Sequence, residues 1–168
     1  NNTASSQEAL PCLAMVNKMD KEGCQFGAAV ASISKKLPGA NPIPIQIPLF
    51  RTDQRGDGDP HDLANYVAMD GNDSTSQTPN GAKFMGVVDL IHMRAVLWPS
   101  SSIDSSSSSS FSGGEECAPK LHPLFHTMDN IDQPIDAACP ITQTAVAARE
   151  QLIASLAEVD DVMEEYYL

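Results

Sequence analysis

The sequence predicts an α/β fold, and three features of its patterning support that expectation. An apolar run over 11–16 leads through a polar loop into a helical pattern over 24–37. Apolar stretches over 43–49 and 84–98 predict antiparallel strands. A second helical pattern covers 144–166 and closes the chain. The expected order is therefore strand, helix, strands and helix, with polar insertions between them.

The first part of the chain has the pattern of a strand, a loop and a helix. Residues 11–16, PCLAMV, are continuously apolar, as is typical of a parallel strand that is covered on both faces. Over 24–37, apolar side chains recur every three or four residues and therefore share one helical face. These side chains are Phe26, Val30, Ile33 and Leu37. Pro38 and Gly39 end the helix.

The middle of the chain predicts strands separated by insertions. Over 43–49, isoleucines alternate with prolines and a glutamine, which indicates a half-buried strand. Because a proline cannot donate to a sheet ladder, this strand must be an edge strand or one paired only through its other side. The stretch over 84–98 predicts strands with a turn near its centre. The polar residues near 51–82 predict an exposed, disordered insertion in which only the short stretch LANYVAM, 63–69, could have local structure. The serine-rich residues near 99–120 predict a second disordered insertion.

The C-terminal pattern predicts an amphipathic helix that is broken near Val159. Apolar residues recur at helical spacing from Ala145 to Met163. Asp161 and Glu164 fit a capping box that would restart the second helix.

Composition excludes several classes of function. The formal net charge is −12, and the 10 Lys and Arg residues are scattered, so direct nucleic-acid binding is not expected. The four cysteines form no C-x-x-C pair, which argues against a metal site or a disulfide framework and favours reduced thiols. No apolar run approaches the roughly 20 residues of a membrane span. We therefore expect a soluble chain without a membrane partner.

The polar loop N-K-M-D, residues 17–20, is the candidate functional site. It follows the predicted strand directly and precedes the helix, at the position where open α/β sheets bind ligands. Asp20 can accept both neighbouring donors of guanine, and adenine lacks that pair of donors. Asn17 can bond the opposite edge of the base, and the stem of Lys18 can lie over its ring. The alternative is that Asn17 and Asp20 only cap the helix.

The wider sequence resembles a known family. Three stretches are similar to the translational GTPase elongation factor G: NKMDKEGCQFGAAVASISKKLPGANPIPIQIPLF, FMGVVDLIHMRAVLW and AAREQLIASLAEVDDVMEEYYL. The resemblance implies that residues 1–40 are part of a P-loop GTPase domain. It also implies that residues 41–168 form an inserted α+β subdomain with antiparallel strands and a C-terminal helical pair.

The resemblance also implies ligands and partners. Asn17, Lys18 and Asp20 would contact the base of GTP or GDP, and the parent protein would use magnesium. The ribosome is the expected partner, and the acidic C-terminal helix could meet its stalk protein. Serine-rich insertions are more typical of eukaryotic chains, so a mitochondrial location is expected, and otherwise a cytoplasmic one.

The sequence departs from the family at the phosphate site. It contains no G-x-x-x-x-G-K-[ST] loop and no S-A-[LK] loop, so the fragment alone is expected to be inactive, with no catalytic residue of its own. Two alternatives to a translocation factor stay open. One is a recycling-type mitochondrial elongation factor G, and the other is a non-enzymatic binding module with a GTPase-like fold.

Overall fold

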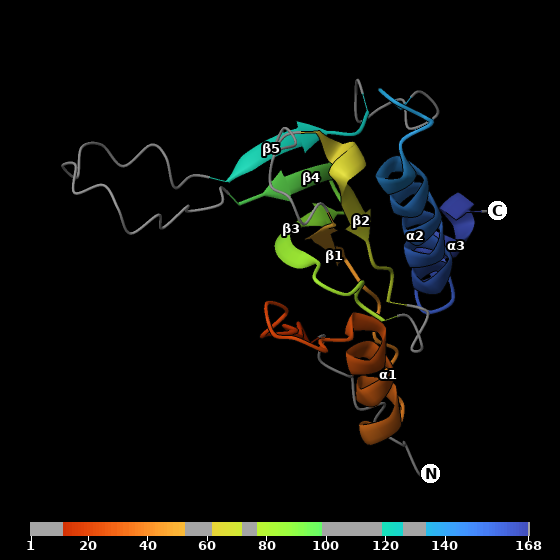
Figure 1. Cartoon of the computed structure of the whole chain (residues 1–168). Helices are drawn as coiled ribbons and strands as arrows, with labels where there is room; N and C mark the ends of the chain where they lie inside the picture. The colour runs from red at the N-terminus through yellow and green to blue at the C-terminus, as the bar shows by residue number, and fades with distance from the viewer. Residues whose placement is uncertain (1–11, 53–61, 72–76, 99–118, 126–133, 168) are drawn as a thin grey trace, which may run out of the picture.

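In the residues that the structure describes, one antiparallel sheet packs with three α-helices (Figure 1). The structure, a computed structural model, describes residues 12–52, 62–71, 77–98, 119–125 and 134–167. The elements are α1 (Phe26–Lys36), β1 (Gln46–Arg51), η1 (Leu63–Asn65), β2 (Tyr66–Ala68), β3 (Lys83–Asp89), β4 (Arg94–Leu97), β5 (Lys120–Pro123), α2 (Pro140–Ala157) and α3 (Asp161–Tyr167). None of the helices in these ranges combines the length and apolarity that a membrane span requires.

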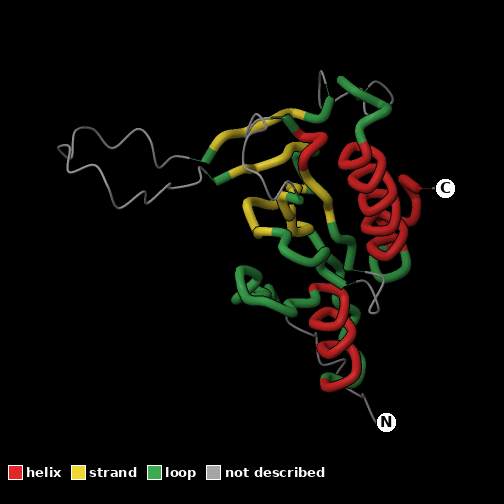
Figure 2. Tube along the Cα trace, in the orientation of Figure 1, coloured by secondary structure: helices red, strands yellow, loops and turns green. Residues whose placement is uncertain are grey.

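The sheet has five strands in the order β2-β1-β3-β4-β5, and every neighbouring pair is antiparallel. Figure 2 shows the strands stacked beside α2, with α1 set apart near the end of the sheet. The predicted antiparallel strands are thus confirmed in kind. β1 begins three residues later than the predicted 43–49 and ends two residues later. β3 and β4 form a hairpin over 84–98, except that β3 begins one residue earlier.

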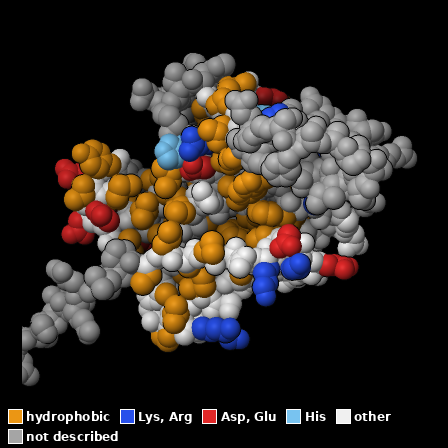
Figure 3. Space-filling model, turned by 90° about the vertical axis from the view of Figure 1, so that its left-hand side faces the viewer, with side chains coloured by type: hydrophobic (Ala, Val, Ile, Leu, Met, Phe, Trp, Pro, Cys, Tyr) orange, Lys and Arg blue, Asp and Glu red, His pale blue; other side chains and the backbone are white. Residues whose placement is uncertain are grey.

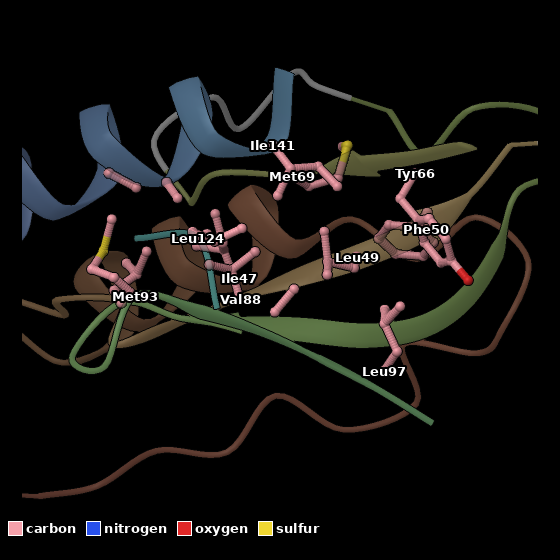
Figure 4. Packing of buried hydrophobic residues seen from close by; sticks show 14 of the residues in the cluster. Ile47, Leu49, Phe50, Tyr66, Met69, Val88, Met93, Leu97, Leu124 and Ile141 are labelled. Carbon is pink, nitrogen blue, oxygen red and sulfur yellow. The ribbon is translucent and has the colours of Figure 1, made fainter. Parts of the chain in front are cut away.

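The hydrophobic core lies between the sheet and α2. Ile47, Val88 and Ala95 lie opposite one another on three adjacent strands, and all are fully buried. Ile141 of α2 points toward this row (Figure 4). Leu124, which follows β5, fills the same layer. Each of the larger of these side chains contributes about 1.5–3 kcal/mol by leaving water, so this layer is a main source of stability.

Pro48 lies within an inner strand, and the expectation of an edge strand is wrong for β1 as a whole. β1 pairs with β2 on one side and with β3 on the other. The carbonyl of Pro48 accepts a hydrogen bond from Met69 N at 3.1 Å, so Pro48 N also points to the β2 side. β2 pairs only with 49–51, so the missing N–H removes no ladder bond there. Pro48 keeps its place opposite Val87 of β3, and on the β2 side only its carbonyl is bonded, so neither predicted alternative holds for the whole strand.

The β3–β4 turn is held by the buried carboxylate of Asp89. Its Oδ1 accepts hydrogen bonds from the backbone amides of Ile91 and His92, both at 3.1 Å. Its Oδ2 lies 2.8 Å from His92 Nδ1 and 3.4 Å from Arg94 Nε. Burial alone would raise the pKa of Asp89, but the contacts with His92 and the Ile91 amide outweigh it and lower this pKa. From α2, Arg149 Nη1 donates to the carbonyls of Leu90 and Ile91.

Replacing Asp89 by asparagine should lower the free energy of unfolding by about 1–2 kcal/mol at pH 7, because the amide keeps one acceptor and loses the charge. A carboxylate whose pKa is lowered in the folded state stabilises that state above its unfolded pKa, near 3.9, and loses this contribution as pH falls through the folded value. Urea unfolding of both proteins at several pH values should show the difference shrinking below about pH 4. A difference that is independent of pH would contradict the role of the charge, and Asp136→Asn, at an exposed turn, is the control.

Three sequence expectations require correction. The strand over 11–16 is wrong, because the described residues 12–16 pair with no other described strand and are mostly exposed. The described part of the insertion over 51–82 is not exposed throughout, because the LANYVAM stretch forms η1 and β2, and Tyr66 in β2 and Met69 directly after it are buried. The cap of α3 is Asp160 rather than Asp161, because Asp160 Oδ1 accepts from the amides of Val162 and Met163 at 2.9 and 3.1 Å.

The helices are otherwise close to their predicted ranges. α1 lies inside 24–37, and α2 with α3 spans 144–166 with the break at 158–160. α2 begins earlier than predicted, at Pro140, where a proline is tolerated because the first helical N–H has no partner within the helix. The predicted serine-rich insertion near 99–120 lies outside the described residues, apart from 119–120.

Candidate functional site

The N-K-M-D residues form a compact turn between 12–16, which have no regular secondary structure, and α1. Lys21 N donates to Lys18 O at 3.2 Å, and Cys24 N donates to Lys21 O at 3.2 Å, which makes two consecutive turns. Lys18 has φ 62°, in the left-handed region that side chains other than glycine rarely adopt. Asn17 Oδ1 accepts from Lys18 N at 2.7 Å and supports this conformation.

The turn separates its side chains into one buried anchor and an exposed polar set. Met19 is 8% exposed and belongs to the core cluster. Asn17, Lys18 and Asp20 are all exposed. Since a single apolar side chain fixes the turn to the body of the protein, the polar groups on either side of it are held close together at the surface. All three residues predicted to contact a base therefore lie on one anchored loop.

The carboxylate of Asp20 is accessible to a ligand. Its partner is Lys21 Nζ at 3.3 Å, and the two side chains are 63% and 70% exposed. An exposed ion pair of this kind contributes only about 0–1 kcal/mol. A ligand that offers two donors can therefore displace Lys21 at little cost.

Helix capping does not explain the polar loop. α1 begins at Phe26, its N-cap residue is Gln25, and no side chain caps it by a hydrogen bond. Asn17 and Asp20 therefore do not cap α1, and the alternative interpretation of these residues is wrong.

Two residues that the sequence did not single out support the loop, since Cys24 contacts it and Thr78 contacts Cys24. Cys24 Sγ donates to Met19 O at 3.1 Å, and Thr78 Oγ1 donates to Cys24 O at 2.6 Å. Thr78 lies 54 residues from Cys24, so no local pattern could have predicted the contact. Cys24 adjoins the helix and had no distinguishing spacing.

The described residues contain a cavity elsewhere and carry no cluster of metal-binding side chains. A cavity of about 380 Å³ lies between η1, the residues after β5 and the start of α2, away from the loop. Within the described residues, no group of three or more His, Cys, Asp or Glu side chains could hold a metal ion. The exposed polar residues of the N-K-M-D loop remain the candidate site.

The fold and the loop together define a mixed α and β protein with an antiparallel sheet and a polar N-K-M-D turn before its first helix. Two curated proteins are similar to it. Elongation factor G of Amoebophilus asiaticus is 30% identical over 158 residues, which cover 94% of this chain and 14% of that protein. Elongation factor G of Fervidobacterium nodosum is 30% identical over 161 residues, which cover 95% of this chain and 15% of that protein.

The chain is thus related to elongation factor G. The similarity extends over nearly all of this chain, and the chain spans about one seventh of the length of these relatives. No family model matches the sequence. No solved structure matches it either.

Proposed function

We propose that this chain is the guanine-recognition segment of a longer translational GTPase of the elongation factor G kind, which uses GTP on the ribosome. The observation that carries the proposal is the exposure of Asn17, Lys18 and Asp20 on one anchored turn, in a chain related to elongation factor G. The longer protein would act in translocation, with ribosome recycling as the alternative role.

The three side chains suit the edges and the face of guanine. The ring N1–H and the exocyclic amine are neighbouring donors, and the two oxygens of Asp20 can accept one hydrogen bond each. Adenine presents an acceptor in place of the N1–H donor, so it cannot make this pair of bonds. Asn17 can bond the opposite edge through its amide, and the methylene stem of Lys18 can cover the ring. Specificity for guanine would thus come mainly from Asp20.

Exposed apolar surface near the loop supports the idea of a larger domain. Leu13 and Met15 are 86% and 85% exposed, and Leu37 at the end of α1 is also exposed. Figure 3 shows hydrophobic side chains spread over one face of the molecule. Apolar segments of this length are ordinarily covered. We propose that residues 1–40 belong to a GTPase domain whose remaining strands cover 12–16, and that 41–168 form its inserted subdomain.

The phosphates and magnesium would be held elsewhere in the longer protein. This sequence contains no loop of the G-x-x-x-x-G-K-[ST] type. Phosphoryl transfer requires backbone amides around the phosphates, a lysine and a coordinated magnesium ion. The segment would therefore supply base specificity and no catalytic group. We propose the acidic residues from Glu158 to Glu165 as the surface that meets the ribosomal stalk protein. We also propose that the longer protein is located in mitochondria.

Titration calorimetry with GDP and magnesium tests the proposal on two proteins. The 168-residue chain alone should show no measurable binding, because base contacts must offset a cost of about 4 kcal/mol or more for capturing a flexible ligand. The net charge of −12 also repels the phosphates. The longer protein that contains the chain should bind GDP and not ADP.

Two results would contradict this expectation. Low-micromolar binding by the chain alone would mean that it contains a phosphate site. A longer protein that binds no guanine nucleotide would instead favour the non-enzymatic module, which the missing phosphate loop also permits.

A further inference from the structure

The N-K-M-D loop is tied to a distant part of the chain by two side-chain hydrogen bonds in series. The hydroxyl of Thr78 donates to the carbonyl of Cys24 at 2.6 Å. The thiol of Cys24 then donates to the carbonyl of Met19 at 3.1 Å. Met19 stands between Lys18 and Asp20, two of the proposed base contacts, so the series ends inside the candidate site.

The direction of these bonds follows from the number of protons. Thr78 Oγ1 and Cys24 Sγ are also 3.5 Å apart, and either atom could donate across that distance. Each group carries only one proton, and both protons are already directed to backbone carbonyls. The Cys24 Sγ–Thr78 Oγ1 contact is therefore a close approach without a hydrogen bond, because both protons are donated to backbone carbonyls. The loop is thus attached to the connection between β2 and β3 through the side chains of Cys24 and Thr78 together.

A second contact joins the same connection to the start of α1. Gly71 packs so closely that a Cβ atom added to it would lie 2.8 Å from Pro44 Cγ and 3.2 Å from Phe26 Cε1. Phe26 is the first residue of α1 and is buried. The connection between β2 and β3 therefore contacts the start of α1 at Gly71, and at Thr78 it contacts Cys24, which bonds to the loop.

We infer that Thr78 is a positioning residue for the guanine-recognition loop, acting through Cys24 and Met19. The effect on nucleotide binding rests on the proposed function, whereas the hydrogen bonds from Thr78 to Cys24 and from Cys24 to Met19 do not depend on it. Thr78 lies in the inserted part of the chain, whereas Asn17, Lys18 and Asp20 precede that part. The insertion would thereby set the position of Asp20, and a change in the insertion would alter affinity for the base.

Hydrogen exchange of the 168-residue chain tests the linkage without any nucleotide. Thr78→Val keeps the shape and removes the donor, so the amides of 18–24 should exchange about two- to tenfold faster, the range expected for one lost hydrogen bond. Thr78→Ser restores the hydroxyl and should restore slow exchange. Thr52→Val removes a comparable hydroxyl bond, to Asn65 O, at a distant site and should leave 18–24 unchanged. Unchanged exchange in Thr78→Val would overturn the inference.

Nucleotide binding by the longer protein tests the consequence. Thr78→Val should weaken GDP about two- to tenfold and should reduce the preference for guanine over xanthine nucleotides, with thermal stability close to that of the parent. Thr78→Ser should recover both quantities. A uniform loss that tracks thermal stability would indicate a merely structural role and would overturn the inference. If exchange responds as expected but the unmutated longer protein binds no guanine nucleotide, the proposed function fails while the linkage stands.

Discussion

Replacing Asp20 by asparagine in the longer protein is expected to weaken GDP binding by at least ~3 kcal/mol, which is more than a hundredfold. The carboxylate offers two acceptors to the two neighbouring donors of guanine. The amide offers one acceptor and places an NH₂ group against the second donor. One hydrogen bond is lost and a repulsive contact between donors replaces it, so the penalty exceeds that of simple removal.

Xanthine nucleotides provide the matched measurement for Asp20→Asn. Xanthine has an oxygen where guanine has its amine, and the amide of the variant can donate to that oxygen. The variant should therefore bind XDP more tightly than the unmutated protein does, while GDP binding falls. Glu22→Gln makes the same carboxylate-to-amide change at an exposed position two residues after the loop, and it should alter the affinity for neither GDP nor XDP. Guanine affinity within a few-fold of the parent in Asp20→Asn would refute a role in base recognition.

The local patterns of the sequence predicted the helices and the hairpin. Apolar spacing placed α1 and the α2–α3 pair within a few residues of their observed limits, because one face of each helix contacts the rest of the protein. The hairpin was predictable because β3 and β4 are adjacent in sequence and joined by a short turn. Periodicity could not reveal that the Asp89 carboxylate and Arg149 hold that turn, since Arg149 lies 59 residues beyond the carbonyl of Leu90.

The errors arise where the outcome depends on neighbours that are distant in sequence. An apolar run such as 11–16 predicts a strand only if other strands pair with it, and no described strand does so. Pro48 suggested an edge strand or one paired only through its other side, but β1 pairs on both sides. The proline is tolerated there because β2 is too short to require a hydrogen bond from the nitrogen of Pro48. The candidate site was predictable as residue types and as a loop. Its attachment through Thr78 was not, because a single threonine in a polar stretch gives no signal of its partner.

Gly86 is the position at which a small substitution should have the largest effect on folding. It lies in β3, an inner strand, opposite Leu49 of β1 and Leu97 of β4. The register between β1 and β3 shifts next to this pair, at Leu49 and Phe50, so the strands are irregular here. A Cβ atom added to Gly86 would lie 2.2 Å from the backbone oxygen of Val96. Backbone on an inner hairpin cannot give way as the end of a flexible side chain can.

Gly86→Ala should therefore lower the free energy of unfolding by more than about 3 kcal/mol, in the range reached when overpacking displaces neighbouring backbone. Gly23→Ala and Gly39→Ala are the controls, because their added Cβ atoms meet nothing within 4 Å and the only cost is a φ of 74° or 85°. That cost is about 1 kcal/mol. Urea unfolding followed by the fluorescence of Trp98, the single tryptophan, measures all three variants. A Gly86→Ala protein no less stable than the controls would mean that β3 and β4 do not approach as closely as described. If Gly86→Ala is too unstable to purify, the controls still fold and the ordering of the three variants stands as the result.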